Sequence, residues 1–347
     1  MADAVLLLPG DGIGPDVIAA ARRVLDTVRP GIEYSTCDVG LTAVEATGRP
    51  YPADLLDRAR AADAVLFGAV GGDQDLDTAW DLRPEAALFA LRQGLDLFAN
   101  LRPIRSIPAL ADRSAVRDDL AVGVDILIVR ELVGGAYFGE KGMREDGVAF
   151  DTFEYSRETV ARVVRVAFEL ARSRRSSVTS VDKANILRTS QLWRKVAGSV
   201  AEEFPGSSLQ HLLVDNAALQ LLLRPRSFDV VVTENLFGDI LSDSTAAIVG
   251  GLGMLPSASL GATGPGLFEP VHGSAPDIAG RGIANPFAAI LSAGMLLRHG
   301  LGDHESAARV ERAVDDAIES GVRTPDLGGT ASTDEATDAV VRALASN

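Results

Sequence analysis

The sequence has little of several residue types that mark particular classes of protein. Cys37 is the only cysteine among 347 residues, which excludes an intrachain disulfide framework and a cysteine-rich zinc site. No apolar segment approaches the length that spans a membrane. The start of the chain, MADAVLLLPG, has neither a basic leader nor an unbroken apolar run. These absences predict a cytoplasmic protein that makes no contact with membranes.

Positive charge is also scarce. The 48 acidic residues outnumber the 33 basic ones, and the net charge is -15. Because such a protein repels phosphate groups, its charge argues against non-specific binding to nucleic acid. The basic residues include only three lysines, Lys141, Lys183 and Lys195. Because nearly all basic residues of this chain are arginines, the few lysines are candidates for a specific function.

The residues that are present indicate an α/β fold. Short apolar runs alternate with amphipathic segments of helix length, and this rhythm predicts a largely buried sheet. We predict strands at residues 4–8, 64–67, 125–129, 177–181 and 229–233, and helices at residues 16–28, 85–95, 157–173, 187–204 and 286–299. Residues 250–266 are rich in Gly, Pro and Ser and are interpreted as an ordered loop. Residues 134–155 are interpreted as a β-arm that pairs with a second subunit.

The segment PGDGIGP, residues 9–15, follows the first predicted strand and opens the first helix. A dinucleotide-binding loop has this setting, but the spacing here is G-x-G-x-G-P, and Pro15 lacks the N–H group that a phosphate cradle uses. The pattern therefore fits a ligand-binding loop and a tight strand-to-helix turn about equally.

Three arginines stand at informative places. Arg92 lies near the end of the helical segment EAALFALR, Arg102 lies in NLRP, and Arg130 ends the apolar run DILIVR. A guanidinium group grips a carboxylate through two parallel hydrogen bonds. The carboxyl end of a strand in an open α/β sheet faces the ligand crevice, which favours ligand binding for Arg130. For Arg92 and Arg102, taken singly, a surface or ion-pair role is the better interpretation.

Lys183 follows a predicted strand in the segment SSVTSVDKAN, together with Asp182 and Asn185. A partly desolvated lysine has a lowered pKa and can act as a base. The alternative interpretation is a simple ion pair between Lys183 and Asp182.

Two aspartates in TENLFGDILSD, Asp239 and Asp243, are four residues apart and share a helix face. Asp215 is expected at the end of a strand in HLLVDN. Converging carboxylates repel unless they are protonated or neutralised. Oxygen ligands suit Mg²⁺ or Mn²⁺, so these acids predict a metal site. The alternative is a solvated helix face.

The segments HGSAPD, residues 272–277, and IANP, residues 283–286, contain small residues around one histidine and one acid. Such a loop can wrap a nucleotide, and an acid beside the adenosine ribose favours NAD over NADP. Taken alone, a single histidine is more often structural.

Together these motifs resemble, nearly from end to end, the isocitrate/isopropylmalate dehydrogenase family of β-hydroxyacid oxidative decarboxylases. The resemblance is carried by GDGIGP, NLRP, VRELVGGAYFGEKG, VDKAN, VDNAA, NLFGDILSD, GMLPSASLG and EPVHGSAPDIAGRGIANP. It implies a two-domain α/β fold with a large mixed sheet flanked by helices, which is not a Rossmann fold. It further implies a discontinuous NAD-binding domain of residues 1–99 plus 252–347. Residues 100–251 would form a metal-binding, substrate-binding and dimerisation domain.

The resemblance implies an activity. This activity is the NAD-dependent oxidative decarboxylation of 3-isopropylmalate to 2-oxo-4-methylpentanoate in leucine biosynthesis, with Mg²⁺ or Mn²⁺. The active protein would be a homodimer whose sites are shared between subunits. Two alternatives remain open: the same chemistry on another 3-substituted malate (3-alkylmalate, 3-benzylmalate, homoisocitrate, D-malate or tartrate), and a non-catalytic regulatory subunit.

The resemblance also implies roles for individual residues. Tyr137 would supply a proton to the enol carbon, and Lys183 of the partner subunit would take the proton of the 2-hydroxyl group. Substrate binding would involve Arg92, Arg102, Arg130, Leu88, Phe89, Ile186 and Asp215. The metal ligands would be Asp239, Asp243 and Asp215 of the partner subunit. Contacts to NAD would come from Ile13, Glu85, Asn185, His272, Gly273, Ser274, Ala275, Asp277 and Asn285.

Two residues depart from the family pattern near the expected alkyl pocket. Phe89 stands where the family usually has Leu, and Ala136 stands where a larger aliphatic residue is common. An apolar pocket discriminates by only about 1–3 kcal/mol per methylene group. The sequence therefore leaves the alkyl group of the substrate open.

Overall fold

The computed structural model describes residues 2–72 and 78–346, and the chain divides into two compact units. The first unit comprises Met1–Leu97, Ala109–Arg113 and Gly250–Asn347. The second comprises Phe98–Pro108 and Ser114–Val249. Among the described residues, no helix is both long enough and apolar enough to cross a bilayer.

The strands of the first unit combine parallel and antiparallel pairs. Their bounds are β1 (Ala4–Gly10), β2 (Glu33–Thr36), β3 (Ala64–Ala69), β11 (Pro256–Leu260) and β12 (Gly266–Pro270). They are ordered β2-β1-β3-β12-β11, and only the β11–β12 pair among these is antiparallel. Every residue of β3 is buried, which explains why its sequence is continuously apolar rather than alternating.

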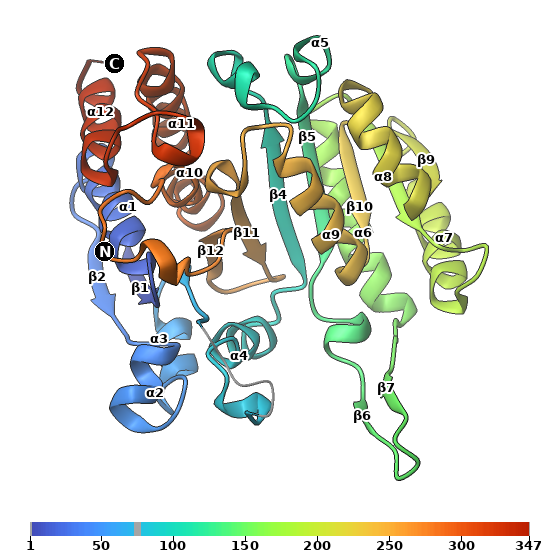
Figure 1. Cartoon of the computed structure of the whole chain (residues 1–347). Helices are drawn as coiled ribbons and strands as arrows, with labels where there is room; N and C mark the ends of the chain where they lie inside the picture. Colours follow the sequence, from blue (N-terminus) through green and yellow to red (C-terminus); the bar gives the residue numbers. More distant parts are fainter. Residues whose placement is uncertain (1, 73–77, 347) are drawn as a thin grey trace. The chain divides into compact units, whose positions relative to one another are not determined.

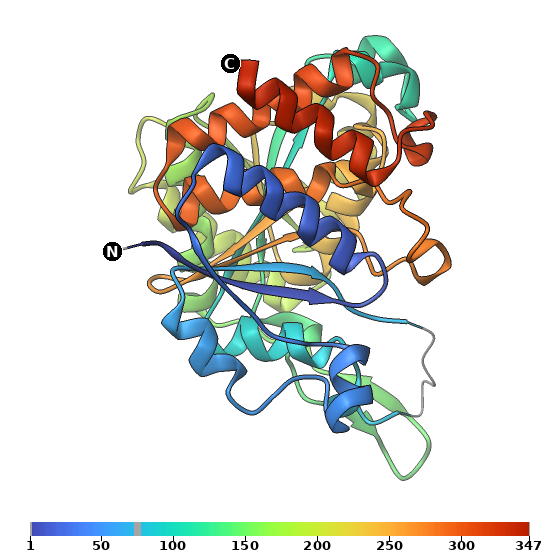
Figure 2. The same cartoon turned by 90° about the vertical axis from the view of Figure 1, so that its left-hand side faces the viewer.

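Helices lie on both sides of these strands. Their bounds are α1 (Gly14–Val28), α2 (Leu41–Thr47), α3 (Leu55–Ala61), α4 (Ala86–Gly94), α10 (Phe287–Met295), α11 (His304–Glu319) and α12 (Thr333–Ser346). Figure 2 shows α1 beside α11 and α12 on one side of the strands, and α3 and α4 on the other. All nine residues of α10 are buried, so this helix is apolar on every side.

The strands of the second unit are also mixed. Their bounds are β4 (Ala99–Arg105), β5 (Asp125–Glu131), β8 (Ser177–Asp182), β9 (Ser208–Leu213) and β10 (Val230–Thr233). They are ordered β4-β5-β10-β8-β9, with β4 antiparallel to β5 and the other pairs parallel. A separate antiparallel hairpin, β6 (Lys141–Met143) and β7 (Ala149–Asp151), extends away from the rest of this unit (Figure 1).

The helices of the second unit are α5 (Asp118–Ala121), α6 (Arg157–Arg172), α7 (Arg188–Ala201), α8 (Val214–Leu223) and α9 (Asn235–Ala246). Helix α6 illustrates why these segments are helical. The hydroxyl of Ser156 caps its first turn by accepting the amide of Thr159. Its buried residues recur three and four positions apart, which gives one apolar face toward β5 and β10.

The predicted α/β class with a mixed sheet and flanking helices is confirmed, and the predicted strands and helices are all present with ends shifted by a few residues. Two interpretations need correction. Residues 250–266 contain strand β11, because Pro256–Leu260 pairs with β12. Asp215 lies in the first turn of α8 and does not end a strand. The segment around Arg102, for which the sequence analysis assigned no secondary structure, is strand β4.

Candidate functional site

Helix α9 directs two carboxylates toward one arginine. Asp239 and Asp243 both contact the guanidinium group of Arg102, with N–O distances of 3.3 and 2.9 Å. The prediction that these two acids share a helix face is therefore confirmed. Arg102 is only 5% exposed, so the surface role considered for it is wrong, and it belongs to a buried ion-pair network.

Arg102 is held by two further polar side chains. Its Nε donates to Asn100 Oδ1 at 2.9 Å, and its Nη1 donates to Ser242 Oγ at 2.7 Å. Asn100 lies on the same strand, β4, and Ser242 lies on α9 between the two aspartates. The guanidinium plane is therefore fixed by protein acceptors before any ligand binds.

Arg130 lies at the end of β5 and is 1% exposed. Its Nε and Nη2 donate to Asn235 Oδ1 at 3.0 and 2.7 Å, and its Nη1 donates to Asp239 Oδ1. The guanidinium group also lies 5.6 Å from the centre of the Tyr137 ring. The predicted position of Arg130 at the end of a strand is confirmed, and the structure adds its contact with Asp239 of α9.

Tyr137 lies in the one-turn 3₁₀ helix Gly135–Tyr137, and its hydroxyl donates to Asp239 Oδ2 at 2.8 Å. Burial, followed by the hydrogen bond to Asp239 and the charge of that carboxylate, raises the pKa of Tyr137 to about 12. The hydroxyl therefore keeps its proton at neutral pH and has the state that a proton donor needs.

Lys183 pairs with Asp215 and not with Asp182. Its Nζ donates to Asp215 Oδ1 at 2.6 Å. Asp182 instead forms two hydrogen bonds of 2.8 Å with Arg194, so the alternative pairing considered for Lys183 is wrong. The bond from Lys183 lowers the pKa of the exposed Asp215 carboxyl, which remains ionised. Lys183 and Asp215 thus form an ion pair just beyond the ends of β8 and β9.

The donor set of α9 suits a hard divalent cation. Burial raises the pKa of Asp243, Arg102 lowers it, and the neighbouring Asp239 raises it again, as expected for two acids that repel each other. Carboxylate oxygens are the ligands that Mg²⁺ and Mn²⁺ prefer. Within residues 2–72 and 78–346, no three His, Cys, Asp or Glu side chains form a group that could hold a metal ion. Water, a substrate or another chain could supply the remaining ligands of a site on α9.

In the first unit, Arg92 is buried on α4 and its Nη2 contacts Glu269 Oε1 at 3.1 Å. Its Nε is buried without a hydrogen-bond partner among the described atoms. The guanidinium group lies 5.8 Å from the centre of the Phe89 ring, and that ring packs edge-on against Trp80 at 5.0 Å. Arg92 is therefore not a surface residue, and it retains one donor that its own unit does not satisfy.

The glycine-rich loop before α1 packs against the HGSAPD segment. The amide of Ile13 donates to the carbonyl of Ser274 at 2.8 Å. A Cβ atom on Gly12 would lie 2.0 Å from that same carbonyl oxygen, at a φ of +58°. Only glycine fits there, so the loop is a tight turn that joins two segments separated by about 260 positions in the sequence.

His272 has one ring nitrogen, Nε2, that can accept a hydrogen bond from a ligand. Its Nδ1 donates to the carbonyl of Gly273 at 2.9 Å, which leaves Nε2 as the unprotonated nitrogen of the neutral ring. Nε2 is buried and has no hydrogen-bond partner among the described atoms. Burial also lowers the pKa of His272, so the ring is neutral at pH 7. A buried acceptor without a donor fits the amino group or hydroxyl of a bound nucleotide.

The other predicted nucleotide residues differ in accessibility. Asn285 is buried, and its amide group bonds Asp326 and the amide of Phe287 at 2.9 Å each. Asp277 and Asn185 are exposed, while Glu85 is half-buried before the start of α4. Asn285 thus has a structural role at the start of α10 that its motif did not reveal.

The predicted alkyl-pocket residues fall in both units. Leu88 and Phe89 lie half-buried on α4 in the first unit. Ile186 lies in the second unit and is 68% exposed, which is high for a residue of its size. The structure of one chain therefore does not bring these three residues into one pocket within a single unit.

Sequence reasoning missed several residues of these groups. Asn100 and Asn235 are the acceptors that orient Arg102 and Arg130, and each lies inside a motif that the sequence contains, NLRP and NLFGD. Asp11 is buried and accepts the amides of Leu41 and Gly71, which ties the glycine-rich loop to its surroundings. The signal for all three was a short polar side chain next to a buried apolar run.

Comparison with known proteins identifies the family. A model of the isocitrate/isopropylmalate dehydrogenases matches residues 4–340. The chain is 51% identical over 357 residues to a 3-isopropylmalate dehydrogenase from Halalkalibacterium halodurans, covering 98% of this chain and 97% of the relative. It is 52% identical over 351 residues to a protein of the same name from Novosphingobium aromaticivorans, covering 98% of this chain and 99% of the relative.

Solved structures agree with these sequence relatives. An isocitrate dehydrogenase from Methylococcus capsulatus superposes with a TM-score of 0.86 at 38% identity, covering 99% of both chains. A β-decarboxylating dehydrogenase from Thermococcus kodakarensis superposes with a TM-score of 0.83 at 38% identity, covering 99% of this chain and 96% of the other. The predicted fold type is confirmed.

Proposed function

Because the chain belongs to the isocitrate/isopropylmalate dehydrogenase family, we propose that it catalyses the oxidative decarboxylation of 3-isopropylmalate to 2-oxo-4-methylpentanoate. NAD would be the oxidant, Mg²⁺ or Mn²⁺ the metal, and leucine biosynthesis the pathway. The observation that carries this proposal is the connected group formed by Arg102, Arg130, Tyr137, Asp239 and Asp243.

This group supplies both parts of the chemistry. Arg102 and Arg130 present buried guanidinium donors that suit the carboxylates of a malate. Tyr137 holds a proton that the carbon next to the departing carboxylate needs. Lys183 of the partner subunit would remove the proton of the 2-hydroxyl group as the hydride leaves C2. When bound, NAD accepts that hydride, and the divalent ion supplies positive charge to the developing oxyanion.

We assign the metal to Asp239 and Asp243, joined by Asp215 of the partner subunit. The two α9 carboxylates have the oxygen chemistry that the metal requires, and the described part of one chain supplies no third acid beside them. NAD is assigned to the first unit. There, the amide of Ile13 donates to the carbonyl of Ser274, and Nε2 of His272 is a buried acceptor without a partner among the described atoms. The backbone of Gly273, Ser274 and Ala275 would contact NAD, together with Ile13 and His272.

The remaining assignments complete the proposal. Glu85 and Asn185 would face the nicotinamide, and Asp277 and Asn285 the adenosine end of NAD. Arg92 would use its unpartnered Nε on a substrate carboxylate, which offsets the cost of leaving that donor buried. Leu88, Phe89 and Ile186 of the partner subunit would contact the alkyl group. We expect a cytoplasmic homodimer.

The proposal is tested by following NADH formation with NAD, Mg²⁺ or Mn²⁺ and a set of substituted malates. The set contains 3-isopropyl-, 3-methyl-, 3-ethyl- and 3-benzylmalate, isocitrate, homoisocitrate, D-malate and tartrate. We expect the highest kcat/KM with 3-isopropylmalate and a loss of turnover on chelation of the metal. A different best substrate would indicate that Phe89 and Ala136 have changed the pocket, with the fold and the chemistry retained. Binding of NAD and metal without turnover of any substrate would indicate a regulatory subunit.

A matched pair of lysine variants sharpens this test. Lys183→Ala removes the proposed base, whereas Lys195→Ala removes an exposed lysine on α7. We expect the first variant to lose kcat by about 10²–10⁴-fold, the usual contribution of a general base, and the second to keep it. Equal activity in the two variants would contradict the assignment of the base.

A further inference from the structure

Two buried acids lie at the ends of the neighbouring strands β5 and β10, next in sequence to Arg130 and Thr233. The register of the parallel strands β5 and β10 pairs Arg130 with Thr233. Glu131 is the last residue of β5, and Glu234 is the first residue after β10. Glu131 is 0% exposed and Glu234 is 3% exposed. Burying ionisable groups costs stability, and apolar residues would fill these places more cheaply. The two acids therefore need an explanation other than packing.

Each acid is used as a backbone acceptor. Glu131 accepts the amides of Val133 and Gly134 at 3.0 and 2.9 Å, which folds the chain tightly after β5. Glu234 accepts the amides of Leu236 and Phe237 at 3.0 and 2.7 Å, which caps α9. One acid thus shapes the loop that leads to Tyr137, and the other fixes the helix that carries Asp239 and Asp243.

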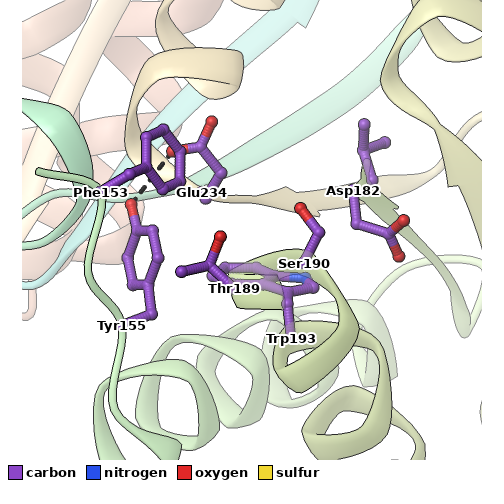
Figure 3. A pocket seen from close by; sticks show the side chains of 8 residues that line it. Phe153, Tyr155, Asp182, Thr189, Ser190, Trp193 and Glu234 are labelled. Atoms are coloured by element: carbon purple, nitrogen blue, oxygen red, sulfur yellow. Dashed lines mark hydrogen bonds between the residues drawn. The ribbon is translucent and has the colours of Figure 1, made fainter. Parts of the chain in front are cut away.

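Tyr155 connects these two elements. Its hydroxyl donates to Glu234 Oε2 at 3.1 Å (Figure 3). It also accepts the amide of Asn235 at 3.0 Å. Its ring packs edge-on against Phe153 at 5.7 Å and against Trp193 at 5.8 Å. Tyr155 lies on the segment between β7 and α6, so a third part of the second unit is joined to the two strand ends.

The chain after β5 runs directly over Tyr155. A Cβ atom on Gly134 would lie 2.6 Å from Tyr155 Cε1, and one on Gly135 would lie 2.5 Å from the Tyr155 hydroxyl. Gly135 also has a φ of +71°. Both glycines are therefore needed for the loop to approach the ring. The position of the ring in turn determines the position of the turn Gly135–Tyr137.

Asn235 connects Tyr155 and the glycine loop to Arg130 through hydrogen bonds. Its amide N–H is held by Tyr155, its Nδ2 donates to the carbonyl of Gly134 at 3.1 Å, and its Oδ1 receives the guanidinium group of Arg130. Arg130 and Tyr137 in turn share the carboxylate of Asp239. An unbroken series of hydrogen bonds thus runs from the buried acids to the proposed site.

We infer that Glu131, Tyr155 and Glu234 form a positioning cluster that sets the places of Arg130 and Tyr137 for the decarboxylating reaction. The inference rests on the proposed function and adds residues to it. None of the three acts on the substrate directly. Tyr155 acts on Arg130 through Asn235 and on Tyr137 through the glycine loop.

The first test compares Tyr155→Phe with Tyr51→Phe, a tyrosine of the other unit, in the full-length enzyme. Tyr155→Phe removes the hydroxyl and keeps the ring. We expect the KM for 3-isopropylmalate to rise and kcat to fall, together about tenfold or more in kcat/KM, with the KM for NAD unchanged. Loss of a structural contact alone would reduce the amount of folded enzyme and leave both KM values as they are. Unchanged kcat and substrate KM in Tyr155→Phe would overturn the inference.

The second test uses two glycines with similar backbone strain. Gly135→Ala places a Cβ against the Tyr155 hydroxyl, whereas Gly123→Ala, at a φ of +78°, meets only Arg226 Cδ at 3.7 Å. We expect the activity of Gly135→Ala to fall well below that of Gly123→Ala. Adding Tyr155→Phe to Gly135→Ala removes the nearest clashing atom. The double variant should therefore lose less activity than the product of the two single losses. Multiplicative losses would show that the two residues do not act through their contact.

A third measurement does not depend on turnover. The melting temperatures of Tyr155→Phe, Arg130→Lys and their combination test whether the two residues are coupled within the fold. A non-additive shift supports the positioning cluster even if 3-isopropylmalate proves not to be the substrate. An additive shift overturns the cluster. If instead the unmodified enzyme turns over none of the malates, the proposed function fails, and the coupling result still stands by itself.

Discussion

At the scale of single residues, the proposed site depends on guanidinium groups whose donors are largely committed to the protein. Arg102 bonds Asn100, Ser242 and the two α9 aspartates at once. A lysine at this place would keep the charge but lose the planar fork that reaches these acceptors together. Charge alone therefore does not determine what the site can bind.

We predict that Arg102→Lys lowers kcat/KM for 3-isopropylmalate by roughly 10–100-fold, because charged hydrogen bonds are worth about 1.5–3 kcal/mol each. The control is Arg105→Lys, an exposed arginine on the same strand. Steady-state kinetics with saturating metal and NAD measure both variants. Similar losses in the two would mean that the effect comes from β4 in general and not from the site.

Glu131 gives a prediction on pH. Burial raises the pKa of this carboxyl to about 7, against weaker lowering by the Val133 and Gly134 amides, Arg162 and Tyr155. Between the ordinary range of a glutamate and about pH 7, the folded state therefore binds a proton that the unfolded state does not. The resulting stabilisation is present at low pH and is lost as the pH rises through about 7.

We therefore expect the melting temperature to fall from about pH 5.5 to about pH 8 by more in the unmodified protein than in Glu131→Gln. The glutamine is neutral at both pH values and removes this contribution to the slope. Differential scanning calorimetry across the range measures the difference. Parallel curves would show that Glu131 does not titrate in this window.

At the scale of elements, a glycine of α9, Gly238, allows the helix to lie close to strands β5 and β10. A Cβ atom on Gly238 would lie 2.7 Å from Arg130 Cγ and 3.1 Å from Thr233 Cγ2. The helix can therefore approach β5 and β10 closely enough for Asp239 to reach Arg130 and Tyr137. The helix-weakening effect of a glycine is tolerated here because the close approach requires it.

Two helical glycines test this account. Gly238→Ala should lower both stability and turnover, because the added methyl group displaces Arg130. Gly198→Ala on α7, where nothing lies within 4 Å of the added atom, should instead raise the free energy of unfolding by up to about 1 kcal/mol. Urea unfolding and NADH formation measure both effects. A stabilised and fully active Gly238→Ala variant would contradict the close-approach argument.

At the scale of the whole molecule, the second unit exposes apolar side chains that isolated surfaces seldom carry. Leu219 and Leu223 on α8 are 53% and 50% exposed, and Ile240 on α9 is 58% exposed. Met143 on the β6–β7 hairpin is 68% exposed. Such a set fits an interface with a second copy of the chain, which would also bring Lys183 and Asp215 to the partner's site.

We predict that the double variant Leu219→Glu, Leu223→Glu sediments as a monomer and loses most of its turnover, because each site would lack the partner's residues. The control is Val122→Glu, an apolar residue that is 41% exposed beyond α5. Analytical ultracentrifugation and kinetics at equal concentration compare them. A fully active monomer would show that the sites are not shared, and an intact dimer would place the interface elsewhere.

The sequence by itself determined the α/β rhythm, the positions of most helices and strands, and the candidate residues. It could do so because apolar periodicity and strand-end polar residues are local signals. Only the tertiary structure decided which groups meet. Asp215 and not Asp182 pairs with Lys183, Asn235 orients Arg130, and Tyr155 supports the loop of Tyr137. These contacts join residues far apart in the chain, and strand order and helix approach, which no local pattern encodes, bring them together.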